Sequence, residues 1–332
     1  MRRSVAALLL VASVCVAGEI VARWLWIETP RPPPPVVPPG DWPTFHGLAE
    51  AHEPGQQGIY RGVFYRTNEQ GYRGPAWAFE PEPGVARVLL IGDSVAVGSG
   101  VAEADRYSDL VPALLSADTD LPPVEVLNMS RGGSDVVNAR VRMAFALRDV
   151  GAHVTVYGFS VDDLRDAVPR LELPARERWA QTHRRVAVES PTSFLWRTVV
   201  HLVRAGAGGS LLDDEVRVYL ANEDAWLTLR DQLERMGRLN ERAGTCGLVF
   251  IQPRLYDLGP GHPYRAVYAR VAEEAAAAGL FVHSAFSAFM WQSALPLWVG
   301  VNDRHPNAAG HAILAESLAE GLRGLPSRCW GR

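Results

Sequence analysis

The chain contains no lysine. All 33 of the positive charges that Lys and Arg contribute to its 332 residues come from Arg. Lysine holds the phosphates in a Walker A loop, forms the Schiff base of pyridoxal enzymes and acts as the base of a Ser-Lys dyad. These mechanisms are therefore excluded in their usual form, and a general base must come from His, Asp, Glu or Tyr.

Cysteine is scarce, and positive charge has no excess. The three cysteines, Cys15, Cys246 and Cys329, are too few for a four-cysteine zinc site or for a fold stapled by disulfides. Cys246 and Cys329 either pair in an oxidising compartment or remain two buried thiols. The formal net charge of −4 lacks the clustered basic surplus of a nucleic-acid surface. We therefore do not expect nucleic acid as a partner.

The first 28 residues have the pattern of an export signal. Arg2 and Arg3 precede an uncharged, mostly apolar run from Val5 to Gly18, which suits the h-region of a signal peptide. Counted through to Ile27, the segment is long enough to span a bilayer as a helix. We expect residues 1–28 to be an uncleaved single-pass membrane anchor, with the rest of the chain outside the cytoplasm. Secretion after signal cleavage is the alternative.

A proline-rich segment follows the export signal. Seven of the ten residues from Pro30 to Pro39 are Pro, a composition that adopts extended polyproline II. We expect a linker at residues 29–41 and a single large domain at residues 42–332. Residues 165–243 form a stretch longer than an ordinary crossover, which predicts an insertion that serves as a lid, a substrate wall or added packing.

From residue 86 onwards, short apolar runs rich in β-branched residues alternate with amphipathic stretches. Such alternation is typical of parallel strands joined by helices. It predicts a three-layer α/β/α fold with a doubly wound sheet of about five parallel strands, in which ligands bind beyond the carboxyl ends of the strands. The predicted strands are Ala86–Ile91, Val124–Asn128, Val154–Phe159, Leu248–Gln252 and Leu280–His283. The predicted helices are Tyr107–Ala117, Asn138–Val150, Trp226–Ala243, Pro263–Ala278 and Asn307–Leu322.

The first predicted strand ends in a turn that suits a nucleophile. Gly92 permits a tight turn, which would place the hydroxyl and the backbone N–H of Ser94 above the sheet edge. Gly92, Asp93 and Ser94 alone are also a common turn, in which Ser94 caps a helix. Near the C-terminus, His305 is predicted on a loop just before the last helix, with Asp303 two residues away. These residue types together favour nucleophilic catalysis.

Polar residues also follow the second and third predicted strands. The loop after Asn128 contains Gly132 and Gly133, which let backbone N–H groups approach a ligand closely. Asp162 and Asp163 follow the third strand. Because the carboxyl ends of parallel strands share one edge of the sheet, we expect these residues near Ser94.

The chain thus has four short sequence blocks, which contain Ser94, Gly133, Asp162 and His305 in that order. Together these blocks resemble those of the SGNH (GDSL-like) hydrolase superfamily, and the resemblance covers roughly residues 60 to 325. The segment Arg66–Gly74 also looks like one that, in many membrane-anchored bacterial members, precedes the strand ending in the Gly-Asp-Ser turn. The resemblance therefore implies that the expected anchor lies in a bacterial inner membrane. The resemblance implies a flavodoxin-like SGNH hydrolase fold and a serine esterase or deacylase that works through an acyl-serine, with neither a metal nor an organic cofactor. The substrate would be an acylated small molecule or glycan, such as an O-acetylated envelope or extracellular glycan.

The resemblance also implies a role for each site residue. Ser94 is the nucleophile, His305 the base and Asp303 the acid that orients the imidazole. Backbone N–H groups of Ser94 and Gly133 would form the oxyanion hole with the side chain at position 162. The family has Asn where this chain has Asp162, and an ionised carboxylate accepts hydrogen bonds without donating them. Three functions therefore stay open: hydrolysis, O-acyl transfer to an exopolysaccharide by the same serine, and glycan binding or assembly without catalysis.

Overall fold

The computed structural model describes residues 13–21, 52–117, 120–166, 216–217, 219–300 and 303–331. The chain divides into two compact units, one of Met1–Arg31 with Arg170–Val218 and one of Pro32–Pro169 with Tyr219–Arg332. In the first unit, residues 13–21 form a helix. No helix within the described ranges is long and apolar enough to cross a membrane. Most of the predicted anchor, the linker and much of the insertion lie outside these ranges and stay predictions.

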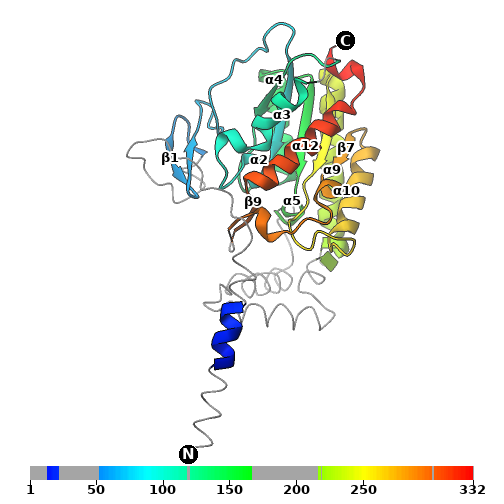
Figure 1. The fold of residues 1–332 in the computed structure, drawn as a ribbon. Helices are drawn as coiled ribbons and strands as arrows, with labels where there is room; N and C mark the ends of the chain where they lie inside the picture. The colour runs from blue at the N-terminus through cyan, green and yellow to red at the C-terminus, as the bar shows by residue number, and fades with distance from the viewer. Residues whose placement is uncertain are drawn as a thin grey trace, which may run out of the picture. The chain divides into compact units, whose positions relative to one another are not determined.

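The second unit is built on a parallel sheet of five strands in the order β4-β3-β5-β6-β7 (Figure 1). The order runs outwards from β3 in both directions, which is the doubly wound topology predicted from the sequence. Every residue of β3 and β5 is buried, which explains their continuous apolar runs. The strands are β3 (Ala86–Gly92), β4 (Val124–Asn128), β5 (Val154–Phe159), β6 (Cys246–Ile251) and β7 (Phe281–Ser284).

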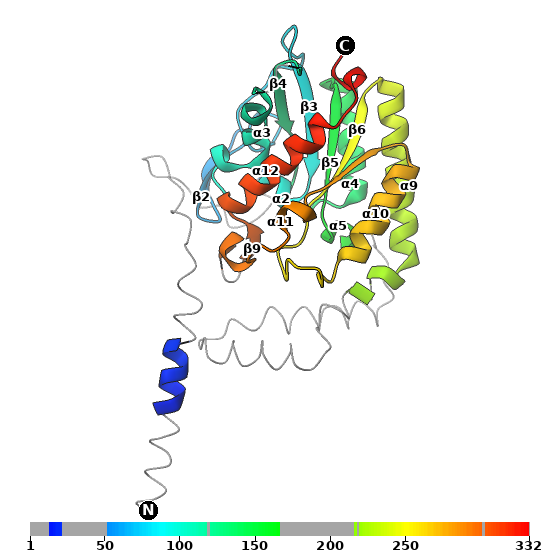
Figure 2. The ribbon, with the colours of Figure 1, turned by 45° about the vertical axis from the view of Figure 1, so that its right-hand side comes forward.

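Helices cover both faces of this sheet and confirm the three-layer α/β/α fold (Figure 2). On one face α3 packs against α12, and on the other α4 packs against α9. Several helices begin at a side-chain cap, among them α12, where Asn307 accepts a hydrogen bond from the backbone N–H of Gly310 as the sequence suggests. The helices are α2 (Ser94–Val97), α3 (Tyr107–Leu115), α4 (Val136–Asp149), α5 (Asp162–Asp166), α9 (Glu223–Ala243), α10 (Arg265–Ala277), α11 (Phe286–Phe289) and α12 (Ala308–Arg323).

Two antiparallel strand pairs stand outside the five-stranded sheet. The first joins β1 (Gln57–Tyr60) to β2 (Val63–Arg66), and the second joins β8 (Trp298–Gly300) to β9 (Asp303–Pro306). His305 therefore lies in a short strand, and the predicted loop at this position was wrong. No strand pattern is visible at Asp303–Pro306, because three of its residues are polar and the fourth is Pro.

A buried arginine ties the segment after β2 to the end of α2. The guanidinium of Arg73 donates to the carbonyl oxygens of Val97 at 3.1 Å, Gly98 at 2.6 Å and Val101 at 2.6 Å. Burial and the neighbouring charge of Arg106 lower the pKa of Arg73 to about 9, so the guanidinium stays charged at neutral pH. A positive charge at the carboxyl end of a helix is favourable, and here it fixes the helix that begins with Ser94.

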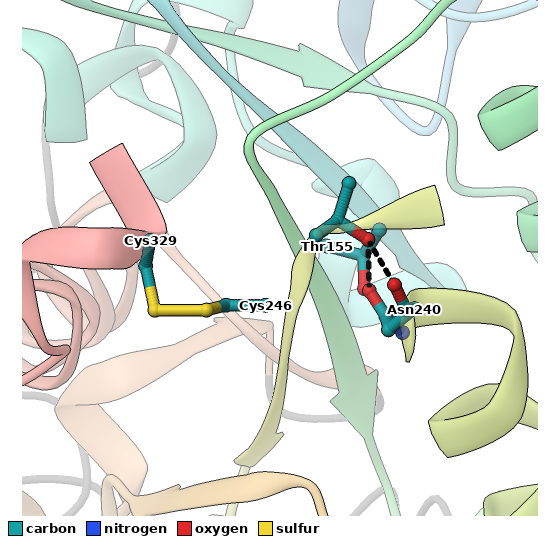
Figure 3. Close-up of a disulfide and its surroundings, with 5 residues drawn as sticks. Thr155, Asn240, Cys246 and Cys329 are labelled. Atoms are coloured by element: carbon teal, nitrogen blue, oxygen red, sulfur yellow. Dashed lines mark hydrogen bonds between the residues drawn. A yellow bond between two sulfur atoms is a disulfide. The ribbon is translucent and has the colours of Figure 1, made fainter. Parts of the chain in front are cut away.

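Cys246 and Cys329 form a disulfide, so the first of the two alternatives left open by the sequence holds (Figure 3). The bond joins the start of β6 to the C-terminal turn Ser327–Trp330 across 83 residues of sequence. Nearby, the Thr155 hydroxyl donates to the Asn240 side-chain oxygen at 2.8 Å and attaches α9 to β5. The disulfide thus closes a long loop around the second half of the sheet.

We expect replacement of both Cys246 and Cys329 by Ser to lower the free energy of unfolding by about 4 kcal/mol, because the unfolded chain regains the entropy of a large loop. Urea unfolding of the variant and the oxidised protein measures the difference. Cys15→Ser, which removes a free exposed thiol, is the control and should leave the unfolding midpoint unchanged. An unchanged midpoint in the double variant would contradict the prediction.

Candidate active site

The three side chains predicted as nucleophile, base and acid meet at one end of the sheet, where α2, α5 and β9 gather (Figures 1 and 2). The Oγ of Ser94 lies 2.9 Å from His305 Nε2. His305 Nδ1 lies 2.5 Å from Asp303 Oδ1, and the backbone N–H of His305 donates to the same oxygen at 3.1 Å. Such a line of serine, imidazole and carboxylate can move the hydroxyl proton onto the imidazole.

The turn that presents Ser94 is built by its two predecessors. A Cβ at Gly92 would lie 2.7 Å from the Cβ of Ala96 and 2.9 Å from the carbonyl oxygen of Gly158, so a larger residue has no room there. Asp93 caps α2, and its Oδ1 accepts from the backbone N–H of Val95 at 2.9 Å. The alternative in which Ser94 is the cap is therefore wrong, and the Ser94 hydroxyl is left to bond with His305.

The ionisation of Asp303 decides which ring nitrogen of His305 carries the proton. Burial alone would raise the pKa of Asp303, but hydrogen bonds from His305 and the charges of His305 and Arg61 lower it to about 2. Asp303 is therefore ionised at neutral pH. Because Asp303 accepts, the imidazole carries its proton on Nδ1, and Nε2 is left to accept the hydroxyl proton of Ser94.

Arg61 contacts the site although sequence reasoning did not find it. Its Nη1 lies 2.7 Å from Asp303 Oδ2 and 3.2 Å from His305 Nδ1. Arg61 and Gly62 form the turn between β1 and β2, and both have positive φ, 50° and 79°, as type I′ turns require. The apolar and aromatic residues on both sides of Arg61 and Gly62 could have indicated a hairpin, but no local pattern indicates which residue the Arg61 side chain contacts.

The loop that carries Gly133 is attached to the first strand. The backbone N–H of Arg131 donates to the carbonyl oxygen of Gly92 at 3.1 Å. Asn128, at the end of β4, donates through Nδ2 to the carbonyl oxygen of Ala96 in α2 at 2.6 Å. Gly133 has a φ of 74°, which favours glycine over other residues. The loop after β4 thus follows the same sheet edge as Ser94, while the role of Gly133 stays a prediction.

Asp162 forms an ion pair in this structure. Its Oδ1 accepts from Arg254 Nη2 at 2.6 Å. Arg254 lies on the loop after β6, whereas Asp162 begins α5 after β5, so the two residues come from neighbouring strand ends. The pair therefore places a positive charge beside the carboxylate at position 162.

The buried carboxyl group of Asp163 is linked to Asp93 through Ser160. Asp163 accepts from the Tyr157 hydroxyl at 2.7 Å and from the backbone N–H of Ser160 at 3.1 Å. The Ser160 hydroxyl in turn donates to Asp93 Oδ2 at 2.7 Å. Burial and the charge of Asp93 raise the pKa of Asp163 well above its ordinary value. Ser160 and Asp163, which follow β5, thus fix the turn that presents Ser94.

His311 is a structural neighbour of the site. Its ring stacks on Tyr107 with 5.5 Å between centroids, and its Nδ1 accepts from the backbone N–H of Tyr107 at 3.2 Å. Burial and the charges of Arg106 and Arg73 lower the pKa of His311 to about 3, so the ring is neutral. Within the part of the chain that the structure describes, no group of three or more His, Cys, Asp or Glu side chains could hold a metal ion.

The profile of the GDSL-like Lipase/Acylhydrolase family matches residues 90–313. The chain belongs to this family. The match begins inside β3 and ends inside α12, so it contains Ser94, His305 and Asp303 but not Arg61. No curated protein matches the chain.

Several solved structures are similar to this chain. One is an acetylxylan esterase from Geobacillus stearothermophilus, with 16% identity and a TM-score of 0.44, covering 73% of this chain and 95% of that chain. Another is an alpha/beta hydrolase enzyme from the metagenome of Lake Arreo, Spain, with 12% identity and a TM-score of 0.45, covering 73% and 96%. A third, the acetyl xylan esterase AlAXEase, has 14% identity and a TM-score of 0.43, covering 71% and 99%. The family assignment rests on the match over residues 90–313.

Proposed function

We propose that the protein is a serine esterase or deacylase that removes O-acyl groups, O-acetyl groups foremost, from envelope or extracellular glycans. The observation that carries this proposal is the 2.9 Å contact of Ser94 Oγ with His305 Nε2, with Asp303 on the far side of the imidazole. Membership of an acylhydrolase family supports it. The acetylxylan esterases among the similar structures suggest the acyl group and the class of substrate to test first.

The proposed reaction proceeds in two halves. Ser94 Oγ attacks the ester carbonyl carbon while His305 Nε2 takes the hydroxyl proton, and the imidazolium then gives that proton to the departing sugar oxygen. This leaves an acyl-Ser94 ester. A water molecule attacks the same carbonyl carbon, His305 takes a proton from the water, and the proton returns to Ser94 Oγ as the carboxylic acid leaves. Asp303 keeps the imidazole in the required tautomer throughout.

The tetrahedral oxyanion needs hydrogen-bond donors. We assign the backbone N–H groups of Ser94 and Gly133 as two of them, and the guanidinium of Arg254 as the third in place of the family's Asn. Arg254 is held on both sides, since its side chain donates to Asp162 and its backbone N–H donates to the Tyr268 hydroxyl at 2.8 Å. A donor that is fixed before the reaction lowers the barrier more than one that must reorient.

We also propose that the enzyme works outside the cytoplasm. The Cys246–Cys329 disulfide supports this location, because such bonds persist in oxidising compartments. The apolar residues of the 1–28 segment supply the export signal, as an uncleaved inner-membrane anchor or as a cleaved signal peptide. The substrates reachable from there are acylated glycans of the envelope or the surroundings.

Acetylated and unacetylated glycans distinguish hydrolysis from acyl transfer. We expect the enzyme to release acetate from an acetylated xylo-oligosaccharide and to add no acetyl group to an unacetylated acceptor, because acyl-Ser94 is passed to water. Acetate release and the mass of the acceptor are measured in the same reaction. Acetyl gain by the acceptor without acetate release would replace the hydrolase proposal by an O-acyltransferase that uses the same serine.

A further inference from the structure

Arg61 binds the oxygen of Asp303 that His305 does not use. Asp303 Oδ1 accepts from His305, and Asp303 Oδ2 accepts from Arg61 Nη1 at 2.7 Å. A carboxylate bonded through both oxygens to two different partners cannot rotate without losing one of them. The plane of the Asp303 carboxylate is therefore set jointly by β9 and by the β1–β2 turn.

The backbone at Arg61 is in a conformation that arginine seldom adopts. Its φ of 50° lies in the left-handed region, where a residue with a Cβ is strained. The first position of such a two-residue turn is ordinarily Asn, Asp or Gly. Strain of this kind persists where the surrounding structure requires it. Here the strained turn carries the guanidinium to Asp303, which gives the unusual residue a role in the site.

We propose that Arg61 is a positioning residue of the active site, which holds Asp303 for His305 and, as a fixed positive charge beside the imidazole, sets the pH range in which His305 acts as a base. The inference rests on the proposed esterase function. It places one positioning residue of the site outside residues 90–313, the segment that the family profile matches.

The charge of Arg61 opposes protonation of the imidazole. Arg61 Nη1 is 3.2 Å from His305 Nδ1, which already carries a proton, so the contact is between a cation and an N–H group. Asp303 attracts the imidazolium, and Asp93 under α2 and His311 in α12 also interact with His305 electrostatically. Removing Arg61 ends the repulsion and leaves the charge of Asp303 less compensated. Both changes favour the imidazolium, so the imidazole would take a proton from solvent at a higher pH.

Three replacements of Arg61 separate charge from hydrogen bonding. Lys keeps the charge, Gln keeps a donor without the charge, and Ala removes both. We expect the acidic limb of the kcat/KM profile for p-nitrophenyl acetate to move to higher pH in Arg61→Gln and Arg61→Ala, and to stay near its wild-type position in Arg61→Lys. We also expect kcat at the optimum to fall about tenfold in Arg61→Ala with KM nearly unchanged, since orientation of the base is lost.

Arg66→Gln is the matched control. Arg66 lies in the same hairpin and also forms an ion pair, with Glu103 at 2.6 Å, but this pair does not include the site. Its pH profile should equal that of the wild type. A wild-type profile in Arg61→Gln and Arg61→Ala would overturn the proposal. So would a shift in Arg61→Lys as large as that in Arg61→Ala, since the retained charge would then have no effect.

A titration without substrate distinguishes failure of this inference from failure of the proposed function. The imidazole resonances of His305, assigned by comparison with His305→Gln, are followed by NMR against pH in the free protein. We expect the midpoint to rise in Arg61→Ala and to keep its wild-type value in Arg66→Gln. If the wild type hydrolyses no ester but the midpoint rises, the esterase proposal fails and the Arg61 contact stands. If esters are hydrolysed and the midpoint does not move, the Arg61 proposal fails alone.

Discussion

Ser94→Ala is expected to reduce kcat for ester hydrolysis at least about a thousandfold and to abolish labelling by a fluorophosphonate probe. The hydroxyl at 2.9 Å from His305 Nε2 is the group that would form the acyl-enzyme. His305→Gln should have a similar effect, because without a base the hydroxyl keeps its proton. The variant that carries both changes should be no worse than either alone, since the two side chains act as one unit.

A second serine provides the control for Ser94. Ser116 is exposed at the end of α3, and its hydroxyl donates to the carbonyl oxygen of Ala113 at 2.8 Å. Ser116→Ala should keep full activity and full labelling. Two results would contradict the esterase proposal: a Ser94→Ala variant that is still labelled, or a well-folded wild type that is neither labelled nor active. The second result would favour a glycan-binding or assembly role without catalysis.

Arg254→Ala is expected to reduce kcat about a hundredfold with a smaller change in KM. Without Arg254, the Asp162 carboxylate would lose the positive charge that lies 2.6 Å from it, and its negative charge would oppose the developing oxyanion more strongly. A donor is also lost, and removal of one oxyanion donor typically costs about a hundredfold or more in rate. Initial rates over a range of substrate concentrations separate kcat from KM.

Asp162→Asn in the Arg254→Ala background is the decisive companion. It removes the repelling charge and supplies the amide that the family ordinarily has at this position, so we expect it to restore most of the lost activity. Arg230→Ala, which breaks an ion pair of similar length with Glu274 on the surface, should leave kcat unchanged. A wild-type kcat in Arg254→Ala would show that the guanidinium has no part in the reaction.

The sheet could be predicted from the sequence chiefly because its inner strands β3, β5 and β6 are almost wholly buried and therefore form continuous apolar runs. β4 and β5 have the predicted bounds, Val124–Asn128 and Val154–Phe159, since their apolar residues begin and end with the strands. β6 begins at Cys246, two residues before the predicted start, because Cys246 and Gly247 do not look like strand residues. β8 and β9 were missed, because β8 has only three residues and β9 consists of polar residues and Pro.

The residues of the candidate site also differ in whether the local sequence marks them. Ser94 and His305 lie 211 residues apart, yet each stands in a block whose local spacing marks it. Arg61 and Arg254 have no such block, and their partners depend on how separate elements pack. The pairing of Asp162 with Arg254 could not have been found by inspecting residues 158–164 alone, because Arg254 comes from the loop after another strand.

The β1–β2 hairpin also bears on which fragment of the chain would retain all residues of the proposed active site. A fragment that starts at Ala86 would retain all five strands of the central sheet and the whole segment matched by the family profile. It would lack Arg73, which fixes the far end of α2, and Arg61, which holds Asp303. The smallest fragment that contains the complete proposed site therefore starts at or before Gln57. This start lies well ahead of residue 90, where the family match begins.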